Sequence, residues 1–127
     1  MHFSCIKRKR EMSMPHFVID CSERILLTHC EEKINQEIHK VAHLTGLFDE
    51  KDIKVRVNPF KHYSVANRKE DFIHVFANVM EGRTTTQKAE LSKAVVAKLN
   101  DLFPSVENIA MNVRDFEKAT YCNKSML

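Results

Sequence analysis

Basic side chains occupy three positions where they could bind an anion. Lys54 and Arg56 alternate along an apolar run, so both would lie on one face if that run is a strand. Arg83 comes just before Thr84, where a helix is predicted to begin, and the backbone amides of a helix N-terminus favour negative charge. Arginine stays charged and can hold a carboxylate with two hydrogen bonds. Taken alone, Arg83 is better explained as an ordinary exposed arginine before a helix, and Arg56 fits surface charge as well as it fits a binding site.

The histidines and cysteines do not predict a metal site. His39 and His43 are four residues apart, but they lie away from the apolar stripe of their predicted helix and form no H-E-x-x-H pattern, which indicates a solvated face. His74 alternates within a strand, where we expect a core or interface position. No two of the four cysteines form a C-x-x-C pair, and we expect Cys21 and Cys30 to fill the interior. The sequence therefore predicts neither a metal nor another cofactor.

The net charge of +3 comes from the first thirteen residues, which hold the basic run Lys7–Arg10 and one acid, Glu11. The remaining chain has equal numbers of basic and acidic residues and gives no electrostatic case for nucleic acid. A nucleic-acid or localisation patch in the basic run is the alternative. With no membrane span and no secretory signal, we expect a cytoplasmic protein with reduced thiols.

Residues 1–13 have no helical or strand periodicity. The purine-rich codons of Lys, Arg and Glu just before Met14 resemble a ribosome-binding site that has been translated by mistake. We therefore predict that the natural chain starts at Met14, that this methionine is removed, and that residues 14–127 form a single domain. A genuine disordered extension is the alternative.

From residue 14 onward, the pattern is strand, helix, strand. Residues 17–21 form a short apolar strand, and residues 53–57 form an alternating strand that we expect Pro59 to end. Between them, Thr28 and Glu31 predict a capping box for a helix that ends near Gly46. The apolar stripe of this helix consists of Ile34, Ile38 and Val41.

The same pattern recurs 56 residues later. Residues 72–79 repeat the first strand, Thr84 and Gln87 repeat the capping box, and residues 109–113 repeat the second strand. Two β-α-β units joined by residues 61–71 predict an α+β fold, with a four-stranded sheet and both helices on one face. A homo-oligomer would bury the other face. The second helical stripe consists of Leu91, Val95, Leu99 and Leu102.

Ferredoxin-like RNA-binding modules share this order of elements. Phe72 and Phe76 share one strand face, but the basic-glycine-aromatic motif of those modules is missing. The segment from Met14 to Ser22 resembles the start of the 5-carboxymethyl-2-hydroxymuconate isomerase family, which begins Pro-His-Phe and runs into a strand with a Cys-Ser pair. Further similarities lie at residues 52–57, where basic residues alternate, and at the Gly-Arg-Thr turn 82–84. The resemblance extends to about Phe116.

This resemblance implies the tautomerase fold, a homotrimer and a cofactor-free proton shift in a conjugated keto-acid from homoprotocatechuate catabolism. It implies Pro15 as the catalytic base, because proline has a basic secondary amine only at a free N-terminus. It also implies that Arg83, Arg56 and Lys54 bind substrate carboxylates, with Lys54 where the family has the inner arginine of an Arg-x-Arg pair. Phe17, Phe72 and Phe76 are candidates for apolar walls around Pro15.

We therefore predict an isomerase that acts on a small anionic substrate and has neither nucleic-acid nor membrane partners. Two alternatives stay open. One is another activity of the tautomerase fold, such as a keto–enol tautomerase or a decarboxylase. The other is a non-catalytic oligomeric binding module.

Overall fold

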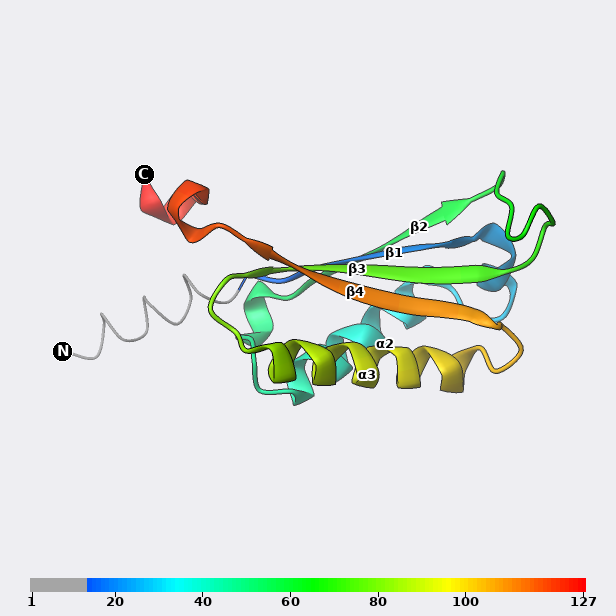
Figure 1. Cartoon of the computed structure of the whole chain (residues 1–127), viewed down its shortest axis with the longest axis horizontal. Coiled ribbons are helices and arrows are strands. Elements are labelled where there is room, and N and C mark those ends of the chain that lie inside the picture. The colour runs from blue at the N-terminus through cyan, green and yellow to red at the C-terminus, as the bar shows by residue number, and fades with distance from the viewer. Residues whose placement is uncertain (1–13) are drawn as a thin grey trace.

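The computed structural model describes residues 14–127, which form one sheet with two helices against it (Figure 1). Residues 1–13 lie outside this described part. The predicted start at Met14 and the alternative of a disordered extension both concern those residues. The main elements are β1 (His16–Ser22), α2 (Glu31–Leu44), β2 (Lys54–Phe60), β3 (Phe72–Met80), α3 (Thr85–Leu102) and β4 (Asn108–Phe116). Short 3-10 helices occur at Glu23–Leu27, Glu50–Asp52, Lys118–Thr120 and Lys124–Met126.

The sheet has the strand order β2-β1-β3-β4, and both helices lie on the same side of it (Figure 1). β1 pairs with β2 in parallel and β3 pairs with β4 in parallel, while the central pair β1–β3 is antiparallel. Two β-α-β units are thus joined side by side, and the predicted fold and repeat are confirmed. Because the central pair is antiparallel, the beginning of β1 lies beside the end of β3.

The core lies between the sheet and the helices. Alternate residues of β1 and β3 are fully buried there, and they pack against one stripe of each helix. Burying such side chains contributes about 1.5–3 kcal/mol each. The predicted stripes are confirmed, although Val41 and Leu102 are only partly buried and Ala42 completes the first stripe. The buried stripe residues are Ile34, Ile38, Ala42, Leu91, Val95 and Leu99.

The two predicted helix starts have different outcomes. Thr84 and Gln87 form the predicted capping box, with the Thr84 hydroxyl 3.1 Å from the Gln87 amide. The box at Thr28 and Glu31 was wrong, because α2 begins at Glu31 with Cys30 as its N-cap. Thr28 has helical backbone angles and its amide bonds back to Ile25, so it closes the preceding 3-10 helix instead.

Two further expectations were wrong. Pro59 does not end β2, which continues to Phe60, and the edge position of β2 explains why a residue without an amide hydrogen is tolerated there. Cys30 is exposed and does not fill the interior, whereas Cys21 is fully buried as predicted. His74, for which we expected a core or an interface position, lies half-buried on the sheet face opposite the helices. It is therefore not a core residue, and the interface position stays a prediction.

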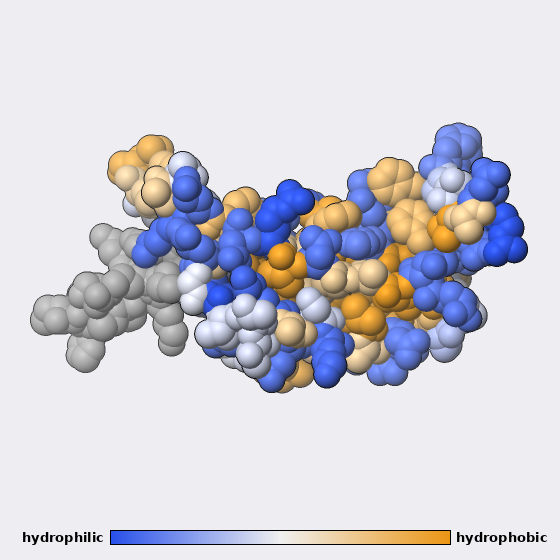
Figure 2. All heavy atoms as spheres, viewed as in Figure 1, coloured by the Kyte–Doolittle hydropathy of each residue, from blue (hydrophilic) through white to orange (hydrophobic). Residues whose placement is uncertain are grey.

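The sheet face opposite the helices carries the second set of alternating side chains, and we call it the open face. It includes Val18, Phe60 and Phe76, and the two phenylalanines rank among the exposed large apolar residues. A further groove lies between α3 and the edge strand β4, and its apolar lining includes Val96, Ala97 and Ile109. Figure 2 shows hydrophobic surface between these two elements. In residues 14–127, no helix combines the length and the apolar character that crossing a bilayer requires.

Candidate active site

Pro15 lies immediately before β1, at the end of the sheet where β3 finishes. Its side chain is fully buried, and Met14 beside it is buried as well. The Pro15 carbonyl oxygen accepts a hydrogen bond of 3.2 Å from the backbone amide of Lys54. This bond extends the parallel β1–β2 ladder by one residue and fixes the start of β1 against the start of β2.

Arg83 reaches the same end of the sheet from the turn between β3 and α3. Gly82 makes this turn with a φ of 121°, a value that other residues rarely adopt. The two terminal guanidinium nitrogens of Arg83 donate to the carbonyl oxygens of Met80 and Leu47, at 3.1 and 2.9 Å. Arg83 therefore fastens the end of β3 to the loop that follows α2.

An aromatic ring supports the Arg83 side chain from one side. The guanidinium carbon lies 4.7 Å from the centre of the Phe48 ring, and Phe48 meets Phe17 edge-on at 6.1 Å. Burial lowers the pKa of Arg83 from its usual value, and the Asp115 carboxylate partly opposes that effect. The Arg83 Nε is buried without a hydrogen-bond partner in residues 14–127. The Arg83 guanidinium therefore keeps N–H groups that no other residue in this part of the chain binds.

Lys54 and Arg56 lie on the open face, as their alternation predicted. The Lys54 ammonium donates to the carbonyl oxygen of Asp52 at 2.7 Å. A guanidinium nitrogen of Arg56 lies 3.1 Å from Nδ1 of His16, the residue that follows Pro15. The Phe116 ring meets the His16 ring edge-on, with 6.5 Å between their centres.

A comparison with models of known families identifies the chain. The model described as 5-carboxymethyl-2-hydroxymuconate isomerase matches residues 15–125. The chain belongs to the 5-carboxymethyl-2-hydroxymuconate isomerase family. A sequence search against proteins of curated function gave no match.

Solved structures agree on the fold. A 5-carboxymethyl-2-hydroxymuconate isomerase from Deinococcus radiodurans R1 superposes with a TM-score of 0.78 at 21% identity, over 89% of this chain and 90% of that one. A 5-carboxymethyl-2-hydroxymuconate delta-isomerase superposes with a TM-score of 0.70 at 15% identity, over 89% of each chain. A fused 4-OT protein, described as an asymmetric trimer, superposes with a TM-score of 0.72 at 8% identity, over 86% of this chain and 92% of its own.

All four residues predicted for the isomerase site lie at one end of the sheet. Lys54 and Arg56 occupy the open face beside Pro15, and Arg83 lies at the turn after β3, on the side of the Leu47 loop. Their functional roles remain predictions. Since β1 and β3 are antiparallel, residues that are far apart in the sequence meet here.

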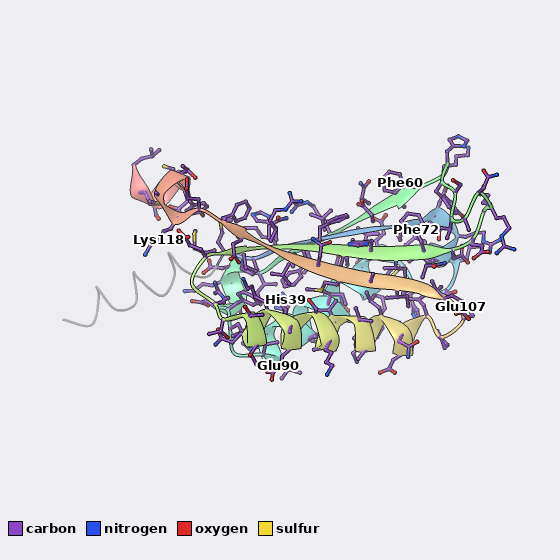
Figure 3. The ribbon with its side chains drawn as sticks, in the orientation of Figure 1. His39, Phe60, Phe72, Glu90, Glu107 and Lys118 are labelled. Carbon is purple, nitrogen blue, oxygen red and sulfur yellow. The ribbon has the colours of Figure 1, made fainter. Side chains whose placement is uncertain are left out.

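The predicted apolar walls are only partly in place. Phe17 points into the core rather than toward solvent. Phe72 begins β3 and packs with Phe60 at the opposite end of the sheet, with 6.3 Å between the ring centres (Figure 3). Phe76 lies on the open face opposite Val18. Phe72 therefore cannot wall Pro15, because the two residues flank opposite ends of the central strand pair.

Sequence reasoning missed Phe48 and Phe116, two aromatic residues at the end of the sheet that holds Pro15. Phe48 follows α2 and carries no periodic signal, while Phe116 is the last residue of β4. Neither lies near Pro15 in the sequence. In residues 14–127, no three potential metal ligands lie together, and His39 contacts the Glu50 carboxylate at 3.1 Å on the surface of α2.

Proposed function

We propose that this protein isomerises an unsaturated 2-hydroxy or 2-oxo acid with two or three carboxylates, of the 5-carboxymethyl-2-hydroxymuconate type. The observation that carries the proposal is the buried Pro15 at a sheet end where Arg83, Lys54 and Arg56 are also found. A base that can accept a carbon-bound proton, together with cations that can hold carboxylates, is what this reaction class requires.

The nitrogen of Pro15 would act as the base once residues 1–14 are absent. Inside a chain it is an amide nitrogen without basicity, so the proposal includes a natural start at Met14 and removal of that methionine. The family match, which begins at residue 15, supports this start. Apolar surroundings and nearby cations both lower the pKa of an amine, which keeps part of it neutral and able to accept a proton at pH 7.

The cations would bind substrate and stabilise the dienolate. From the 2-oxo form, a carbon-bound proton moves to the Pro15 nitrogen and the electron pair of that C–H bond spreads onto the 2-oxo oxygen. From the 2-hydroxy form, the hydroxyl gives up its proton and leaves the same dienolate. Pro15 then returns a proton to carbon, and in the 2-oxo case to a different carbon from the one that lost it. Arg83 and Arg56 can each hold a carboxylate with two hydrogen bonds, whereas Lys54 contributes a single point of charge. No step uses a cofactor.

We further propose a cytoplasmic homotrimer. The open face and the apolar groove beside β4 leave apolar surface that a partner subunit would cover. An assembly of identical chains with rotational symmetry offers one way to bury such surfaces. The trimeric 4-OT structure of the same fold supports this number of subunits.

The decisive experiment compares proteins that differ only at their N-terminus. Protein beginning at Pro15 should isomerise 5-carboxymethyl-2-hydroxymuconate. Protein with a single glycine ahead of Pro15 should lose about 10²–10⁴ of kcat/KM, the usual contribution of a general base. Equal folding of the two, checked by circular dichroism, is the control. Equal activity of the two proteins would refute the proline mechanism.

The lysine at position 54 favours one alternative, a keto–enol tautomerase that acts on a different acid. Lysine keeps the charge of the family's arginine but cannot form its paired hydrogen bonds, so the preferred acid can differ. Tautomerisation of phenylenolpyruvate without isomerisation of the muconate would select a keto–enol tautomerase. Inactivity on both compounds would favour the non-catalytic oligomer.

A further inference from the structure

We propose that His16 donates a hydrogen bond to the 2-oxo oxygen of the substrate, and that Arg56 positions His16 for this role by fixing its tautomer. This inference rests on the proposed function, because it assigns a donor to the oxygen that becomes negative when Pro15 removes a proton. His16 would then be a catalytic residue, and Arg56 would act as a positioning residue in addition to attracting carboxylates.

The contact between Arg56 and His16 determines which imidazole nitrogen carries the proton. The Arg56 guanidinium can only donate hydrogen bonds, and its nitrogen lies 3.1 Å from Nδ1 of His16. Nδ1 must therefore accept with its lone pair. In a neutral imidazole the single proton then belongs to Nε2.

The surroundings of His16 keep the imidazole neutral. Burial lowers the pKa of His16, and the positive charges of Arg56 and Lys54 on β2 lower it further. Its cross-strand partner on β3 is Asn78, which has no charge, and the ring that packs against it from β4 is that of Phe116. The ring thus presents an Nε2–H group without becoming a cation.

This Nε2–H group is available to a ligand beside the proposed base. Within residues 14–127 it has no hydrogen-bond partner, since the two contacts of the ring are Arg56 at Nδ1 and the edge-on Phe116. His16 is also bonded directly to Pro15 in the chain. The proposed base and the proposed donor therefore belong to consecutive residues at the start of β1.

A neutral donor suits this reaction. As the proton moves from carbon to the Pro15 nitrogen, the electron pair of the broken C–H bond delocalises onto the 2-oxo oxygen. Nε2–H stabilises that oxygen by a hydrogen bond and keeps its own proton. Pro15 then returns its proton to a different carbon, so protons and electrons balance without any further reactant.

Variants of the protein that begins at Pro15 test the catalytic role. His16→Phe keeps a flat ring and removes the donor, so kcat should fall by about 10²–10³ while KM changes little. His16→Gln places an amide N–H near the position of Nε2 and should recover at least about tenfold of that loss. His62→Phe, which changes an exposed histidine in the loop between β2 and β3, is the matched control and should leave kcat unchanged. Unchanged kcat in His16→Phe, or no recovery in His16→Gln, would overturn the proposal.

A double-mutant cycle tests the role of Arg56. Arg56→Met should lower kcat when His16 is present and should not lower it further in the His16→Phe background, because the tautomer no longer matters there. Any rise in KM from the lost cation should persist in both backgrounds. Additive losses of kcat would show that Arg56 does not act through His16.

Nitrogen-15 NMR of the imidazole separates this inference from the proposed function. In the protein with a glycine ahead of Pro15, where no turnover is expected, His16 should be neutral with its proton on Nε2. Addition of 2-oxoadipate, a 2-oxo dicarboxylate probe, should shift the Nε2–H signal, which is assigned by its loss in His16→Phe. A proton on Nδ1, a charged ring, or no shift at saturating probe would refute the role of His16 whether or not the wild-type protein is active.

Discussion

Replacing Arg83 by methionine separates two roles of this residue, fastening the fold and binding substrate. In the structure its terminal nitrogens bond to the carbonyl oxygens of Leu47 and Met80, and its guanidinium lies over Phe48. Methionine keeps the apolar stem but removes the charge and both donors. The loop after α2 and the end of β3 then lose their direct connection.

The expected cost follows from these contacts. A hydrogen bond from a charged donor contributes about 1.5–3 kcal/mol, and a guanidinium over an aromatic ring adds about 0.5–1 kcal/mol. The buried Nε without a partner opposes this gain by about 1–3 kcal/mol, and methionine relieves that cost. With both hydrogen bonds counted, the mid-range values give a net loss in the free energy of unfolding of about 3 kcal/mol, which lowers Tm by about 10 °C in a domain of this size.

Urea unfolding at fixed protein concentration measures this loss, with Lys51→Met as the matched control, since Lys51 is an exposed cation in the 3-10 helix Glu50–Asp52. The control should stay within about 0.5 kcal/mol of the wild type. The stability of Arg83→Lys should lie between those of Arg83→Met and the wild type, because an ammonium can reach only one of the carbonyls. If Arg83→Met is as stable as Lys51→Met, the fastening role is wrong. A loss of kcat/KM in folded Arg83→Met protein, assayed well below its Tm, then reports the role of Arg83 toward the substrate and the dienolate.

Two further predictions follow from charge and burial. Burial, together with the negative charges of Asp20 and Glu31, raises the pKa of the Cys21 thiol to about 12. In native protein that begins at Pro15, iodoacetamide at pH 8 should therefore label only the other cysteines. Rapid labelling of Cys21 without denaturant would contradict its burial. Hydrogen bonds from two lysines, Lys40 and Lys33, lower the pKa of Glu37. The ionised Glu37 carboxylate therefore contributes its full stability above the ordinary glutamate pKa of about 4.3, and this contribution is lost as the pH falls through the lowered pKa of Glu37. Glu37→Gln should therefore unfold at lower urea than wild type at pH 7 but not at the acid end of the titration, and a difference independent of pH would exclude this linkage.

Local patterns in the sequence predicted most of the fold. Alternation and helical spacing depend on near neighbours, and they located all four strands and both helices. The capping box at Thr84 was found because the chain there is free to adopt the extended N-cap conformation. The same spacing failed at Thr28, where His29 bonds to the Leu102 carbonyl and packs against Phe103. That contact joins residues about 70 positions apart in the chain, so a four-residue capping motif cannot predict it.

The site was harder to predict, because its geometry depends on strand register. Alternation placed Lys54 and Arg56 on one face, but only the pairing of β1 with β2 brings Arg56 to His16. Arg83 was predicted from its place before a helix, whereas its two carbonyl partners come from β3 and from the loop after α2. Long-range pairing of this kind leaves no periodic signal in a single sequence.

The internal repeat explains why only one end of the sheet can hold such a site. The 56-residue offset that maps His16 onto Phe72 maps Pro15 onto Asp71 and Arg83 onto Leu27. Asp71 lies inside the chain and binds the Ser22 hydroxyl and Arg24, both at 3.0 Å, while Leu27 is 88% exposed. The second copy of the motif therefore has neither a nitrogen that could become a terminal amine nor a cation at the position that corresponds to Arg83. A duplicated β-α-β scaffold offers two equivalent ends, and only the end at which the first copy begins can combine a terminal amine with Arg83.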